Sequence, residues 1–172
     1  MNPRGLLALG LGSGGGILLG WGLGDAAPFI FFSTEEEVGL REQGETVMLI
    51  ATAVLLLASL LLVASGFPLH AVPIGAMGVL TTGVLFSPLG GSIAPHVVFL
   101  LLAPAAAAAL MESSGLAGLL RLRLGGRDLR PLLIGFGLLV ALYGFVLATG
   151  PIGAVGALTA PFIYLLFSRW LR

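Results

Sequence analysis

The side chains that could carry out chemistry in this chain are few. Its 172 residues include two histidines, His70 and His96, and no cysteine. The lack of cysteine removes disulfides, thiolate nucleophiles and cysteine-ligated zinc or iron–sulfur clusters from consideration. Each histidine is a candidate axial ligand for haem, with Met48, Met77 or Met111 as the second ligand. The topology derived below separates the two histidines by most of a membrane, so we do not expect them to bind one metal together.

Sequence motifs for the common enzymatic reactions are absent. There is no Gly-x-Ser-x-Gly elbow, no His-Glu-x-x-His, no P-loop and no dinucleotide fingerprint. The glycine-rich stretch 12–16 lies inside an apolar segment and is not followed by a lysine, so we do not expect it to bind phosphate. The sequence therefore favours a protein that is not an enzyme, and it predicts no catalytic residue, no metal and no cofactor.

Two long stretches of the chain carry no charge. Asp, Glu, Lys and Arg are absent between Glu45 and Glu112 and again between Pro131 and Ser168. A helix rises about 1.5 Å per residue, so it needs about 20 residues to cross a hydrocarbon core of about 30 Å. The first stretch holds three crossings and the second holds two. The expected fold class is an all-α, polytopic transmembrane helical bundle that uses the whole chain, residues 1–172, as a single integral membrane domain.

The apolar segments and their connections predict six membrane-spanning helices. The expected spans are residues 5–24, 46–66, 71–88, 93–111, 131–149 and 151–168. The short connections between most of them make sequential helices antiparallel neighbours in an up-and-down bundle. With six crossings, every arginine except Arg41 falls on one side of the membrane, and the acid-rich loop 25–45 falls on the other. The positive-inside rule then places both termini in the cytoplasm, and we expect the membrane to be a prokaryotic cytoplasmic membrane.

The first span carries glycine at every fourth residue. Gly12, Gly16, Gly20 and Gly24 are expected to form one small-residue face along it. Helices in lipid associate through close backbone approach, which such a face permits. The face has two interpretations, packing inside the bundle or docking to another subunit.

The loops on the two sides differ in character. In the acidic loop, the pairs Ser33 with Glu36 and Thr34 with Glu37 form capping boxes, which predict a short helix or an extension of the second span. In the loop 112–130, leucines alternate with arginines in a pattern that suits a surface helix on anionic lipid, or a contact with a partner protein. The arginines are Arg121, Arg123, Arg127 and Arg130. Four arginines are too few to indicate nucleic acid as a partner.

Two short stretches resemble segments of known membrane-protein families. Residues 151–166 resemble the closing helix of ABC importer permeases for iron chelates and vitamin B12, with one residue lacking and without the upstream signatures of that family. Gly44-Glu45-Thr46-Val47 is similar to an edge in small membrane subunits of Mrp-type cation antiporters and membrane-bound hydrogenases, without the aromatic-arginine-aspartate stretch expected before it. Each likeness covers well under a quarter of the chain. Both families use helical proteins inside larger assemblies, which favours a similar setting for this chain.

The sequence therefore leaves three functions open. The first is a non-enzymatic integral membrane subunit of a larger transport or energy-converting complex, with lipids and helix-docked proteins, or further copies of itself, as partners. The second is a self-contained small-solute transporter or channel, in which prolines of the fourth and sixth spans frame a neutral path. The third is a membrane redox protein that carries haem or another cofactor on His70 or His96.

Overall fold

The computed structural model describes residues 3–27, 35–88, 93–116, 123–124, 127–128 and 151–171. This part of the chain contains five helices and one pair of two-residue antiparallel strands, β1 and β2. The helices are α1 (Pro3–Ala26), α2 (Glu35–Ala64), α3 (Pro68–Leu85), α4 (Ile93–Ser114) and α7 (Pro151–Trp170), and the strands are Arg123–Leu124 and Arg127–Asp128. Four of the helices, α1 to α4, contain segments that are long and apolar enough to cross a membrane. The chain therefore has the character of a multi-pass membrane protein.

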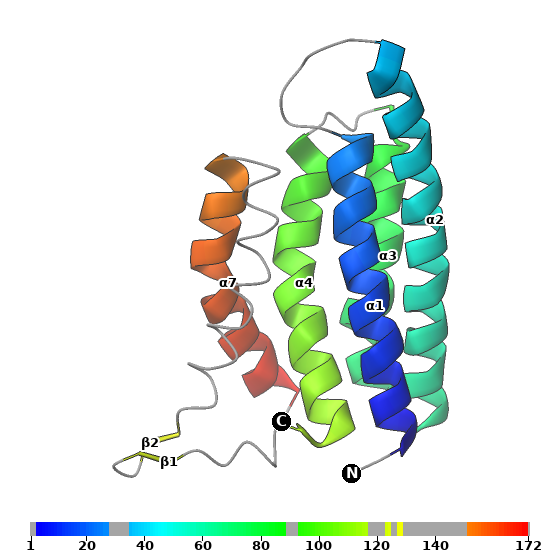
Figure 1. Ribbon diagram of the computed structural model, residues 1–172. Coiled ribbons are helices and arrows are strands. Elements are labelled where there is room, and N and C mark those ends of the chain that lie inside the picture. The colour runs from blue at the N-terminus through cyan, green and yellow to red at the C-terminus, as the bar shows by residue number, and fades with distance from the viewer. Residues whose placement is uncertain are drawn as a thin grey trace.

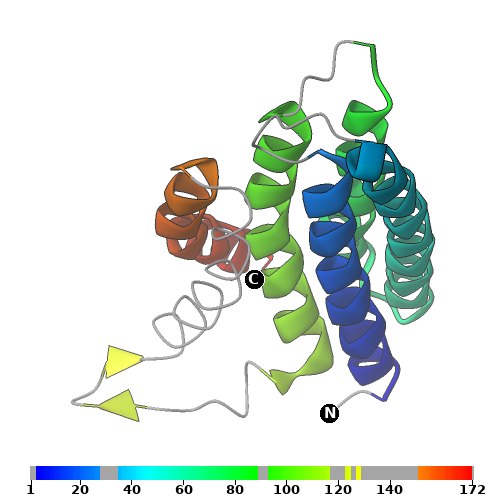
Figure 2. The same cartoon turned by 45° about the horizontal axis from the view of Figure 1, so that its top comes forward.

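The helices stand side by side in an up-and-down arrangement (Figure 1). Helices α1 and α3 run from the lower end of the bundle to the upper end as drawn, and α2 and α4 return. Helix α4 contacts α1, α3 and α7, so it lies at the centre of the described bundle, as the tilted view also shows (Figure 2). Helix α7 runs in the same direction as α4. The chain thus leaves α4 at the lower end and enters α7 at the upper end.

Helix α2 begins well before its predicted membrane span. It is continuous over 30 residues from Glu35, which makes it about 45 Å long. The predicted extension of the second span is therefore confirmed. Along the helix, the Arg41 Nε donates to the Glu45 Oε1 at 3.0 Å, an ion pair between residues one turn apart.

Local backbone chemistry ends α2 and starts α3. Gly66 adopts a φ of +85°, and the Phe67 amide donates to the Leu62 carbonyl at 2.9 Å, which is the hydrogen bond of a Schellman motif. Pro68 follows at the first position of α3, where a missing amide hydrogen is tolerated. A similar glycine, Gly115 with φ +78°, follows the end of α4.

Some of the predicted boundaries differ from the structure. Helix α3 covers Pro68–Leu85 instead of 71–88, because the proline that we assigned to the connection initiates the helix. The surface helix expected within 112–130 is wrong at Arg123 and Leu124, which pair with Asp128 and Arg127 in an antiparallel ladder. The predicted span 131–149 lies outside the described residues.

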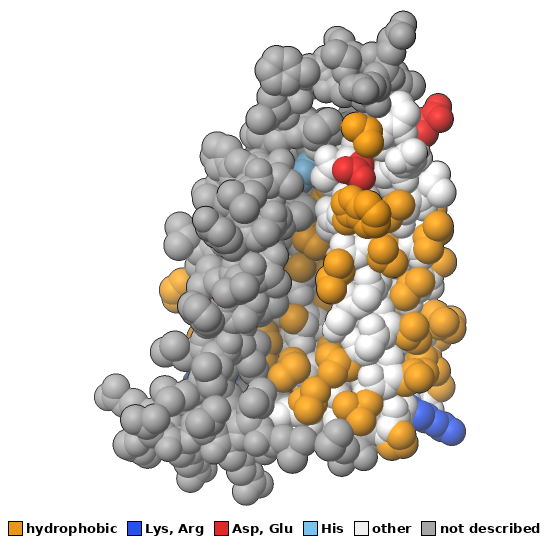
Figure 3. Space-filling view, viewed as in Figure 1, with side chains coloured by type: hydrophobic (Ala, Val, Ile, Leu, Met, Phe, Trp, Pro, Cys, Tyr) orange, Lys and Arg blue, Asp and Glu red, His pale blue; other side chains and the backbone are white. Residues whose placement is uncertain are grey.

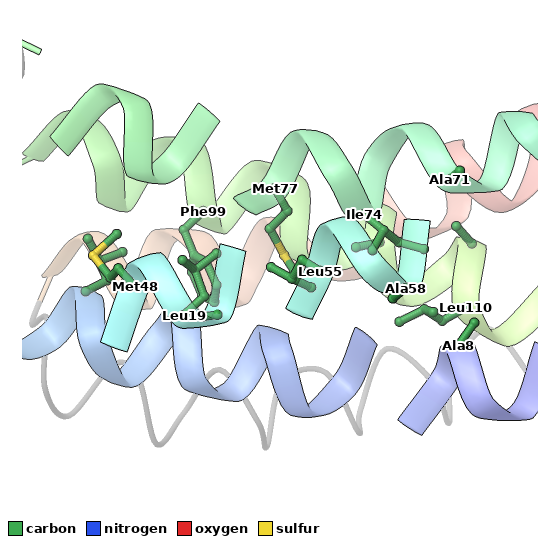
Figure 4. Packing of buried hydrophobic residues seen from close by; sticks show 14 of the residues in the cluster. Ala8, Leu19, Met48, Leu55, Ala58, Ala71, Ile74, Met77, Phe99 and Leu110 are labelled. Carbon is green, nitrogen blue, oxygen red and sulfur yellow. The ribbon is translucent and has the colours of Figure 1, made fainter. Parts of the chain in front are cut away.

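In the core of the bundle, α1 and α2 each carry a stripe of buried residues, and the two stripes have the same spacing; together they form the seam between these helices. On α1 and α2, buried residues recur alternately three and four residues apart. The residues with this spacing are Gly5, Ala8, Gly12, Gly15, Leu19, Gly22 and Ala26 on α1, where Gly20 and Leu23 are buried as well, and Gly44, Met48, Ala51, Leu55, Ala58 and Leu62 on α2. This is the spacing of left-handed coiled coils, in which side chains of one helix fill the spaces between those of its partner. Figure 4 shows such packing where Leu19, Met48 and Phe99 meet between α1, α2 and α4.

Charged and apolar side chains are separated along the bundle. On the face shown in Figure 3, hydrophobic side chains cover the middle, acidic side chains lie near the upper end and a basic side chain lies near the lower end. Large apolar side chains such as Ile17, Leu60 and Phe162 are 65–74% exposed. An apolar surface of this kind between two charged ends suits a helix bundle surrounded by lipid.

Candidate functional site

A close approach between α1 and α2 involves a pair of glycines at the upper end of the bundle. A Cβ atom added to Gly22 of α1 would lie 2.8 Å from the carbonyl oxygen of Gly44 on α2 and 2.9 Å from the Cγ of Met48. A Cβ atom added to Gly44 would overlap the backbone of Gly22 and Ala26. Both glycines are buried. Only glycine at these two positions lets the backbones of α1 and α2 touch.

Other glycines of α1 bring it close to the remaining helices. A Cβ atom on Gly15 would lie 2.9 Å from the Cγ of Leu55 in α2. On the α4 side, a Cβ atom on Gly12 would lie 2.7 Å from a methyl group of Leu110, and one on Gly5 would lie 2.5 Å from the Ser113 carbonyl oxygen. Helix α1 therefore packs into the angle between α2 and α4.

The four glycines of the predicted face have different surroundings. Gly12 contacts α4, and a Cβ atom on Gly16 would lie 3.4 Å from the Met77 Cε of α3. Gly20 is buried, whereas a Cβ atom on Gly24 would meet nothing within 4 Å. A four-residue spacing drifts by about 40° per step around a helix with 3.6 residues per turn, so it cannot follow one neighbour for long.

The glycines that lie against neighbouring helices recur every seven residues instead. Gly5 and Gly12 face α4, and Gly15 and Gly22 face α2. This spacing was present in the sequence as the alternation of three and four residues between small side chains. Testing a period of 3.5 residues as well as the four-residue interval would have found it.

The opposite face of α1 is not covered by the described residues. Leu7, Ile17 and Trp21 are 56%, 74% and 62% exposed. Between them, Cβ atoms added to Gly10 and Gly14 would meet nothing within 4 Å. Helix α1 therefore has small residues on two faces, one packed within the bundle and one open.

Hydroxyl groups link α2 to α3 inside the bundle. The Thr52 hydroxyl donates to the Gly78 carbonyl oxygen at 3.3 Å and lies 2.7 Å from the Thr82 hydroxyl, which can donate to it. Nearer the lower end, the Ser59 hydroxyl donates to the Ala71 carbonyl oxygen at 2.9 Å. In contrast, the Thr81 Oγ1 is buried without a hydrogen-bond partner. The hydroxyls of Thr52, Thr82 and Ser59 therefore join α2 to α3 and are not available to a ligand.

The two histidines lie at opposite ends of the bundle. His70 is in the first turn of α3 at the lower end, where its ring meets the Phe67 ring edge-on with the centroids 5.3 Å apart. His96 is in the first turn of α4 at the upper end and is fully buried. The structure does not bring them together, in agreement with the predicted separation. Within the described ranges, no three His, Asp or Glu residues are grouped in a way that could hold a metal ion.

The arginines of the predicted lipid or partner contact are only partly described. Arg123 and Arg127 belong to the short strand pair, each opposite a residue of the other strand. Arg121 and Arg130 lie outside the described residues.

Comparison with protein-family models, curated proteins and solved structures found no match to this chain.

Proposed function

We propose that this chain is a non-enzymatic integral membrane subunit of a larger transport or energy-converting complex. The observation that carries the proposal is the double character of α1. One side of the helix is packed against α2 and α4 through glycine, and the other side presents Leu7, Ile17 and Trp21 around the uncovered glycines Gly10 and Gly14. Lipid needs no small residues on a helix, whereas a neighbouring transmembrane helix benefits from them.

The interior of the bundle supports the same proposal. Its buried side chains are mainly small and apolar, and most of its described hydroxyl groups are bonded to a backbone carbonyl oxygen or to each other. A path for ions or protons would require charged or unsatisfied polar groups in the membrane interior, because these are kept there only for use. The interior thus favours a scaffold over a carrier.

We further propose a membrane topology with six crossings and both termini in the cytoplasm of a prokaryotic cell. Helices α4 and α7 run in the same direction, which one additional crossing between them would explain. Arg4 and Arg169 are at the lower end of the bundle, and the acidic residues of α2 are at the upper end. This charge distribution matches a cytoplasmic lower end under the positive-inside rule.

The proposal predicts stable association with other proteins. The test is purification of the tagged native protein in mild detergent, followed by identification of all co-purifying chains by mass spectrometry. Stoichiometric partner chains that are lost when Gly14 is replaced by Leu would support the subunit function. The matched control is Gly83→Leu in α3, since its added Cβ also meets nothing within 4 Å but the residue lies on a different helix.

A self-contained transporter remains the second candidate, because Thr81 offers a buried hydroxyl without a hydrogen-bond partner. Solute flux in vesicles that contain only the purified chain would support it. The third candidate, a redox protein with a cofactor on His70 or His96, is tested by the absorption spectrum of the same preparation, since haem would colour it.

A further inference from the structure

We draw no further inference here: the strongest candidate, the open face of α1 formed by Leu7, Gly10, Gly14, Ile17 and Trp21, belongs to the site already described, and nothing in the structure shows which helix covers it.

Discussion

At Gly22 and Gly44, a single hydrogen atom in place of a side chain decides how closely α1 and α2 approach. We predict that Gly44→Ala lowers the free energy of unfolding by about 1–3 kcal/mol, because the added methyl group meets backbone atoms that cannot turn away. The matched control is Gly14→Ala, whose methyl group meets nothing within 4 Å. Gly14→Ala should raise the free energy of unfolding by no more than about 1 kcal/mol, because alanine is more favourable than glycine inside a helix. The measurement is unfolding in mixed micelles, followed by tryptophan fluorescence, to which Trp21 and Trp170 both contribute.

If Gly44→Ala is as stable as Gly14→Ala, the close contact between the two backbones does not hold α1 to α2. In that case the stability of the pair comes from the larger side chains of the seam, such as Leu19 and Leu55.

Thr52 and Thr81 are predicted to change the free energy of unfolding in opposite directions when each is replaced by valine. Thr52 has hydrogen bonds to Thr82 and to the Gly78 carbonyl, so Thr52→Val should reduce the free energy of unfolding by about 0.6–1 kcal/mol. Thr81 buries its hydroxyl without a hydrogen-bond partner, so Thr81→Val removes an unsatisfied polar group. This substitution should raise the free energy of unfolding by about 1 kcal/mol or more. The same micelle titration measures both variants. A loss of stability in Thr81→Val would mean that its hydroxyl has a partner in the native protein.

At this scale the sequence predicted positions better than contacts. The sequence placed His70 and His96 at opposite ends of the bundle, because each lies close to a predicted connection between two spans and these connections are on opposite sides. The contacts of Gly22 with Gly44, and of Thr52 with Thr82, depend on the register between helices. That register is set by packing of the whole seam, which a single sequence does not display.

At the scale of elements, the apolar runs identified the four described spans α1 to α4 because each run is long enough to cross a membrane. The position of α7 was also predicted closely, since proline marks its start. The second span was predicted to begin at Thr46, and the capping boxes with Glu36 and Glu37 predicted either a short separate helix or an extension of this span; the structure shows the extension, from Glu35. Hydropathy ends a span where charge begins, whereas a helix continues for as long as its backbone hydrogen bonds do.

The extension of α2 gives a test of membrane depth. Leu40 and Leu57 have nearly the same exposed fraction, 50% and 51%. Leu40 lies in the charged part of α2 and should face water, whereas Leu57 lies in the apolar part and should face lipid. We predict that Leu40→Cys reacts with a charged maleimide in intact membranes and that Leu57→Cys reacts only after the membrane is dissolved. Equal reactivity of the two would show that α2 is not embedded as proposed.

The orientation of the whole molecule makes a separate prediction. If both termini are cytoplasmic, Leu40→Cys should be labelled by the charged maleimide from outside intact cells. Arg169→Cys, at the exposed end of α7, should be labelled only after the cells are permeabilised. The reverse pattern would invert the topology, and labelling of both from outside would contradict an even number of crossings.

The architecture of the whole molecule could be predicted as a helical membrane bundle because lipid permits few other structures for such apolar segments. Its function could not be predicted to the same degree. Docking between helices in lipid relies on small residues and shape, and these give no chemical signature of the partner. Under the proposed function, the open face with Gly10 and Gly14 suits a transmembrane helix as the partner, but it does not identify that helix.

The central claim is that this chain works as part of a larger membrane assembly. Purification of the tagged native protein in mild detergent, with quantitative mass spectrometry of every chain present and an absorption spectrum, tests it most directly. The proposal predicts one or more partner chains in fixed stoichiometry and a colourless preparation. A homogeneous chain without partners would contradict it.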